Sequence, residues 1–516
     1  MKKMFVVLLA AFLLLACQPT PEHEIIENKG EKKDWQTEAQ PLPDEAPTPV
    51  GEQTVPDRDY ERQESPLYER LHAPKQWSME NSEYGFPIVA SDCPVVLPDI
   101  AAVPAIEAER RSFTQADIDA VAALMFPADT VWYPEVLWTK EDVAITLKEI
   151  MDEAAQADSS KQQYYEDKLA MHRKRYEEAP YAADVVPTTL EINPCQEDYR
   201  TENGKLYDGV KVETRVDGAH WRLIARTDQN DPHGTFIEAS RADLWTDLRQ
   251  PLDTPYGVQM SRAEAIEKAT EVAKTLAGSE YSVCYCAPII AHADQSGEIA
   301  VFPDRYSQWG LVLMRTFNGC PTAYAAEEIG GDMDSTVTAP VHYERMELHI
   351  DDEGVSYLRW STPMTVTGVV QSDAQLLSFD EAAGKAMQHI AARWKYTVEN
   401  DRKNGKDLTV YINRVTLGLW RINKKNGGWY YVPVYHFFSD GIAGDWADYV
   451  NDNPYTADAL GLGSGATIRE LFLRAMEKEE GRWLVSGLCR TFGGEYWGSV
   501  TVNALDGTII DKDKGY

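Results

Sequence analysis

The fold is decided by SRAEAIEKATEVAKTL at residues 261–276 and SFDEAAGKAMQHIAARW at residues 378–394, two stretches with the same order of residue types. Each begins with a serine that is followed three positions later by a glutamate, the pattern of a helix capping box. Apolar residues then recur every three or four positions, as in the buried stripe of a helix. These stripes comprise Ile266, Ala269, Val272 and Leu276 in the first stretch and Ala383, Met387, Ile390 and Trp394 in the second. The sequence therefore predicts two amphipathic helices.

Each predicted helix is followed by strand patterns. Residues 309–316 and 429–438 are runs of apolar and aromatic residues that are typical of strands. Each region then ends in a predicted hairpin, with turns at residues 351–354 and 506–507. We therefore expect an α+β protein whose C-terminal half holds two tandem units, 256–365 and 374–516, each with a helix packed on an antiparallel sheet.

Several motifs of this half resemble a known family. The pattern Ser-x-x-Glu-Ala at 378–382, Tyr-x-x-Pro-x-Tyr at 430–435 and the terminal Val-x-Val-Asn-Ala-x-Asp-Gly-Thr-Ile-Ile at 500–510 look like PepSY-type units. The tandem arrangement, with Asp-Glu-Gly-Val-x-x-Leu-x-Trp at 352–360, is similar to the YycH/YycI accessory proteins of sensor kinases. These motifs mark a fold and none is catalytic, so the resemblance implies a binding or signalling-accessory role.

The N-terminus has the pattern of a lipoprotein signal peptide, residues 1–16. Lys2 and Lys3 precede an apolar run that ends in Leu14-Leu15-Ala16-Cys17, and the run is too short to span a bilayer of about 30 Å. We therefore predict lipidation of Cys17 and attachment to the extracytoplasmic face of the cell membrane. With this motif and Phe-Pro-Ile-Val-Ala-x-Asp-Cys-Pro-Val-x-x-Pro at 86–98, the chain resembles a family of Gram-positive lipoproteins of unknown function.

Two further regions precede the tandem units. Residues 17–65 are acidic and rich in proline without periodic apolar residues, so we expect a disordered stalk. Residues 66–255 are expected to form an N-terminal α+β domain, with helices starting at Thr114 and Thr139 and a polar helix at 159–178. Alternating runs from about residue 188 to 245 predict an antiparallel meander.

Charge and cysteine content limit the possible partners. A net charge of −33 disfavours nucleic acid, whose binding depends on clustered lysine and arginine. Beyond Cys17 the chain has six cysteines, which permit fifteen disulfide pairings or buried thiols, and the sequence does not choose among them. These are Cys93, Cys195, Cys284, Cys286, Cys320 and Cys489. Their spacing does not match a zinc site, and we expect neither a metal nor a cofactor.

The clearest candidate ligand surface is an aromatic strand. In the strand predicted at 429–438, Trp429, Tyr431 and Tyr435 lie on one face and Val432 and Val434 on the other. The aromatic face can stack on a sugar or a peptide, or it can pack beneath the helix of its own unit. An acidic run from Asp440 to Asp452 is either a cleft for a cationic peptide or an exposed connection.

No nucleophile, acid–base or metal motif with suitable spacing stands out in the sequence. We therefore expect a non-enzymatic, lipid-anchored protein that binds an envelope protein or peptide at an exposed sheet edge or groove. The alternatives are an envelope enzyme acting on wall or peptide substrates, and a solute-binding lipoprotein of a transporter. A pocket with converging polar groups of shifted pKa would favour the enzyme, whereas two comparable α/β lobes would favour the solute-binding protein.

Overall fold

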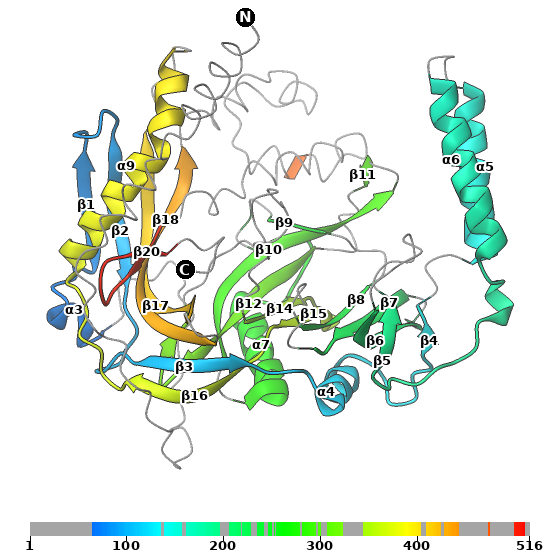
Figure 1. The fold of residues 1–516 in the computed structure, drawn as a ribbon, viewed down its shortest axis with the longest axis horizontal. Coiled ribbons are helices and arrows are strands. Elements are labelled where there is room, and N and C mark those ends of the chain that lie inside the picture. The colour runs from blue at the N-terminus through cyan, green and yellow to red at the C-terminus, as the bar shows by residue number, and fades with distance from the viewer. Residues whose placement is uncertain are drawn as a thin grey trace, which may run out of the picture.

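The structure is a computed structural model, and two sheets dominate it (Figure 1). It describes residues 64–135, 139–156, 161–196, 206–217, 219–228, 235–241, 246–249, 252, 254–278, 281–295, 298–300, 307–322, 344–403, 409–424, 428–442, 473–474 and 500–510. The helices in these ranges are α3 (Leu67–Arg70), α4 (Gln115–Met125), α5 (Lys140–Gln156), α6 (Gln162–Glu178), α7 (Arg262–Ala277) and α9 (Phe379–Lys403), with a 3₁₀ turn at Ala182–Asp184. No helix of the described ranges has the length and apolar content needed to cross a membrane.

The first sheet combines the beginning and the end of the chain. Its eight strands are β1 (Gln76–Asn81), β2 (Ile88–Val96), β17 (Val410–Asn423), β18 (Trp429–Ile442), β19 (Val500–Asn503) and β20 (Ile509–Ile510) in spatial order, with β3 (Ala105–Arg110) and β16 (Met364–Gln371) alongside. All neighbours are antiparallel except β2 and β17, which run parallel. The pairing of β19 with β20 confirms the hairpin predicted at 506–507.

The second sheet is built from the middle of the chain. Its main path is β11 (Glu298–Ala300), β10 (Tyr281–Gln295), β12 (Ser307–Phe317), β14 (Arg345–Ile350), β15 (Val355–Ser361), β8 (Phe236–Arg241), β7 (Ala219–Arg226), β6 (Leu206–Val216) and β4 (Tyr133–Pro134). Short strands at β5 (Asn193–Gln196), β9 (Thr246–Arg249) and β13 (Cys320–Pro321) pair with β6, β10 and β12. The antiparallel pairs β6–β7–β8 and β14–β15 confirm the predicted meander and the hairpin at 351–354.

These pairings confirm the α+β class. The strands of the N-terminal region, however, are divided between the two sheets, whereas the sequence predicted a separate domain. Strands of the region 66–255 do not form a sheet of their own, because β1–β3 join the C-terminal strands and β6–β8 join β15. The boundary expected at residue 255 therefore falls within one sheet. The likeness to tandem PepSY-type units stays a prediction.

The two helices predicted from residues 261–276 and 378–394 are present. Helix α7 covers one face of the second sheet, and α9 covers one face of the first. In α7, Ser261 and Glu264 make a complete capping box, and Ala265, Ala269 and Val272 are buried in a core with Trp309. In α9, the Ser378 hydroxyl donates to Glu381 Oε2 at 2.8 Å. The buried stripe of α9 packs on the first sheet. It comprises Phe379, Ala382, Ala383, Ala386, Met387, Ile390, Ala391 and Val398.

Helices α5 and α6 form a hairpin that extends away from the second sheet (Figure 1). Lys168 of α6 lies 3.7 Å from Glu153 of α5, and Val143 and Ile150 of α5 are buried. His172 is 6% exposed, so it is a packed stripe residue, as expected from its position.

Helix α4 depends on the carboxylate of Asp117. Its oxygens accept hydrogen bonds from the backbone N–H and the hydroxyl of Thr114 and from both terminal nitrogens of Arg111, at 2.7–3.0 Å. Burial raises the pKa of Asp117, but the hydrogen bonds from Arg111 and Thr114 outweigh it and hold the pKa below its usual 3.8. Ionised Asp117 therefore stabilises the native state above pH 4, and this contribution is lost as the pH falls further.

We predict that Asp117→Ala lowers the free energy of unfolding by about 1–2 kcal/mol at pH 7, because it removes the carboxylate half of the α4 capping box and the ion pair with Arg111. The difference from the unmutated protein should shrink as the pH falls below about 4, where the unmutated carboxyl becomes protonated. Urea unfolding at several pH values measures both effects. Asp129→Ala, a change at an exposed position just beyond the same helix, is the control and should stay within about 0.5 kcal/mol.

Candidate functional site

The aromatic strand is β18, and its side chains alternate as predicted. Tyr431 and Tyr435 point into the main core of the first sheet, whereas Val432 and Val434 enter a smaller core on the other face. Tyr431 is 3% and Tyr435 0% exposed. The Tyr435 ring lies edge-on to Phe379 of α9, and its hydroxyl donates to the carbonyl oxygen of Leu377 at 3.1 Å. Both tyrosines are therefore buried, Tyr435 beneath α9 and Tyr431 against Phe317 of β12, and neither offers an exposed stacking face.

Trp429, the third residue of the predicted stacking face, is partly buried and already contacts cations. The guanidinium carbons of Arg110 and Arg421 lie 5.0 and 5.5 Å from the centre of its ring. Burial and the neighbouring Arg421 lower the pKa of Arg110 to about 10. The ring thus stabilises two nearby positive charges by cation–π contact.

A buried carboxylate lies where the two sheets meet. Glu344 directly precedes β14, and its side chain is 2% exposed. Oε1 accepts from the Tyr281 hydroxyl at 2.7 Å and from the Met364 backbone N–H at 2.9 Å, while Oε2 accepts from the Tyr431 hydroxyl at 3.3 Å. Arg315 of β12 supplies the opposite charge at 3.3 Å. Tyr281 and Arg315 belong to the second sheet, whereas Met364 and Tyr431 belong to the first. The Glu344 carboxylate therefore links the two sheets.

The tyrosine partners of Glu344 are held in their protonated form. Burial raises the pKa of Tyr281 and of Tyr431, and the negative charge of Glu344 raises both further. Each hydroxyl can therefore act as a donor over the whole physiological pH range. The Tyr281 oxygen also accepts from the indole N–H of Trp360 at 3.1 Å, and Phe113 packs edge-on to Trp360. These residues form a buried network of hydrogen bonds around the Glu344 carboxylate.

No disulfide joins any two of the cysteines that the structure describes, so none of the pairings that the sequence left open forms among them. These cysteines are Cys93, Cys195, Cys284, Cys286 and Cys320, whereas Cys489 lies outside the described residues. Burial raises the pKa of Cys284 to about 12 and also raises the pKa of Cys320. Both thiols are therefore protonated at neutral pH and poor nucleophiles. Within the described ranges, no three metal-ligating side chains gather at one point.

Several sequence-predicted features cannot be placed. Cys17, residues 18–63 of the predicted stalk and the acidic residues 445–452 lie outside the described residues. The last two residues of the predicted stalk contact the folded part, since Glu64 lies 2.8 Å from Lys75 and the Ser65 hydroxyl donates to the carbonyl oxygen of Pro98 at 2.7 Å. Asp440 belongs to β18 as a strand residue.

The first sheet has an open edge at a place that the sequence did not indicate, because the predicted edge or groove lay between the units 256–365 and 374–516. Strand β1 ends the order of the first sheet, and no strand of the described ranges pairs with its outer side (Figure 1). Its side chains alternate, so that Trp77 and Met79 pack against the core and Ser78 and Glu80 are exposed. The period-2 pattern QWSMEN at 76–81 is the signal that could have identified it.

At this edge, backbone groups of β1 have no strand partner in the part of the chain that the structure describes. The N–H of Val95 donates to the carbonyl oxygen of Lys75 at 3.0 Å, so the backbone hydrogen-bonding groups of residue 75 point toward β2. Because orientation alternates along an antiparallel pair, the N–H groups of Gln76, Ser78 and Glu80 point away from β2. Proteins usually protect such an edge with proline or an inward-pointing charge. Strand β1 has neither, although a bulge in β2 opposite Ser78 twists it locally.

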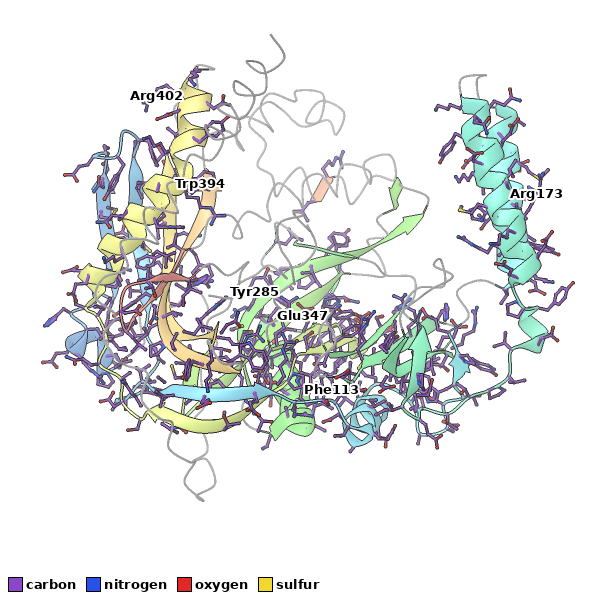
Figure 2. All side chains as sticks on the ribbon, in the orientation of Figure 1. Phe113, Arg173, Tyr285, Glu347, Trp394 and Arg402 are labelled. Atoms are coloured by element: carbon purple, nitrogen blue, oxygen red, sulfur yellow. The ribbon has the colours of Figure 1, made fainter. Side chains whose placement is uncertain are left out.

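Helix α9 fixes the strands beside this edge. Trp77 of β1 lies edge-on to Phe379 of α9, with ring centres 5.4 Å apart, and to Phe437 of β18 at 6.0 Å. At the far end of α9, Arg402 (Figure 2) donates to the carbonyl oxygen of Gly85 in the β1–β2 turn at 2.7 Å. The open edge is thus supported by the core behind it and by a helix over it.

Comparison with known proteins gives no family for the chain. No family model and no curated protein matches it. Among solved structures, it is similar to an uncharacterised protein from Eubacterium rectale ATCC 33656, at 11% sequence identity and a TM-score of 0.35. That similarity covers 85% of this chain and 94% of the other.

We predict that Glu344→Ala lowers the free energy of unfolding by about 3–5 kcal/mol, because it leaves the Arg315 charge buried without its carboxylate. Tyr431→Phe, which removes one of the hydrogen bonds to Glu344, should cost only about 1 kcal/mol and serves as the comparison. Denaturant titration followed by tryptophan fluorescence measures both. A loss below about 1 kcal/mol for Glu344→Ala would contradict the role assigned to this carboxylate.

Proposed function

We propose that this chain is a lipid-anchored, non-enzymatic protein of the extracytoplasmic membrane face that binds an envelope protein or peptide. The observation that carries the proposal is the open edge of β1, six residues long, on a sheet that is otherwise packed beneath α9. An extended segment can add to such an edge through main-chain hydrogen bonds, while pockets for alternate side chains supply specificity. The anchor at Cys17 and the stalk of residues 17–65 would hold this edge away from the lipid surface.

Proline at an outward-facing position tests whether the edge is used. We predict that Glu80→Pro abolishes capture of the partner from envelope extract, because it removes an outward N–H without removing a bond to β2. Glu80→Ala keeps that N–H and loses only the carboxylate, so it should bind the partner more strongly than Glu80→Pro does. Thermal unfolding of both variants shows whether the fold is intact. Equal capture by a folded Glu80→Pro protein would contradict strand addition at β1.

A second test addresses the anchor. We predict that Cys17→Ala leaves the protein unprocessed or releases it from the membrane fraction, because the thiol is the site of lipid attachment. Metabolic labelling with a fatty acid, followed by membrane fractionation, measures both outcomes. Any other cysteine of the body, for example Cys195→Ala, should leave labelling unchanged. A processed Cys17→Ala protein that stays in the membrane would overturn the proposed anchor.

A further inference from the structure

The two faces of β1 differ in chemistry, which restricts the segment that can pair with it. Side chains of an added strand alternate between the same two sheet faces as those of β1. On one face the neighbours are Trp77 and Met79, and on the other they are Gln76, Ser78 and Glu80. An added strand therefore meets one apolar row and one polar row.

The apolar row continues the main core of the first sheet. Trp77 and Met79 are half-buried and pack against that core, with α9 above it. Apolar side chains of an added strand would cover the parts of these two residues that remain exposed. Cross-strand contacts of this kind contribute roughly 0.2–1 kcal/mol per pair.

The polar row is acidic. Glu80 is exposed on β1, Asp92 is exposed on β2 opposite Ser78, and Glu83 is exposed in the turn between the strands. Asp92 accepts a hydrogen bond from the Ser78 hydroxyl at 3.2 Å, so its carboxylate lies beside β1. The basic residue at the start of the strand, Lys75, lies 2.8 Å from the carboxylate of Glu64. The charge at this edge is therefore negative.

From these two rows we infer that the partner is an extended segment in which apolar residues alternate with lysine or arginine. This inference rests on the proposed function and specifies the chemistry of its ligand. The apolar residues face Trp77 and Met79 and provide buried area, while the basic residues face Glu80 and Asp92 and set the preference over other extended segments. The turn at Gly85, bonded to Arg402, limits the paired length to about the six residues of β1.

The experiment uses the full chain with Cys17→Ala, so that lipid does not interfere, and labelled eight-residue peptides that alternate valine with lysine or valine with glutamate. We expect the lysine peptide to bind at least about fivefold more tightly than the glutamate peptide in low salt, with the difference shrinking as salt is added. The double change Glu80→Lys with Glu83→Lys should reverse the preference. The matched control Glu177→Lys, on the exposed side of α6, should leave it unchanged.

Backbone pairing is tested separately with lysine peptides that are N-methylated at alternate amides. Methylation of the amides that face β1 should abolish binding, whereas methylation of the opposite set should not. Equal binding of lysine and glutamate peptides, or no binding of either, would overturn the inference about partner chemistry. The proposed function fails only if the Glu80→Pro protein also captures its envelope partner normally, so the two failures are distinguishable.

Discussion

The buried carboxyl group of Glu344 constrains how the two sheets meet. A buried carboxylate is tolerated only when its charge is paired and its oxygens accept hydrogen bonds. Tyr281 and Arg315 of one sheet and Tyr431 and Met364 of the other meet these requirements. Because hydrogen bonds are directional, a slide of one sheet past the other breaks several bonds at once. The two sheets are therefore held together by a fixed polar contact as well as by apolar packing.

The local features of the fold could be predicted from the sequence because their causes are local. The serine and glutamate of each capping box lie three residues apart, and the hairpin turns contain their own glycines. The pairing of strands was not predictable in this way. Strand β2 lies beside β17, and Ile88 is in register with Val410. Nothing in the composition of either segment indicates which strand it pairs with. Hydrophobic periodicity tells which face of a strand is buried and not which strand lies next to it.

In the candidate site, too, the sequence predicted the local pattern and not the tertiary surroundings. Alternation placed Tyr431 and Tyr435 opposite Val432 and Val434, and the structure agrees. What covers each face depends on α9 and on the second sheet, so sequence alone could not distinguish a ligand platform from a core. Conversely, β1 has an ordinary strand pattern, and its importance comes from lying last in the sheet. An edge is a property of topology, and only the assembled sheet reveals it.

The parallel pairing of β2 with β17 also affects when the first sheet can form during synthesis of the chain. The two strands are roughly 320 residues apart, and at about 5–20 residues per second a ribosome needs on the order of 15–60 s to synthesise the intervening chain. During that interval β2 has only β1 as its antiparallel neighbour, and its other side is unpaired. A chain that stops before β17 would leave the first half without a complete sheet. Strands β1–β3 therefore complete their sheet only when the C-terminal strands are available to pair with them.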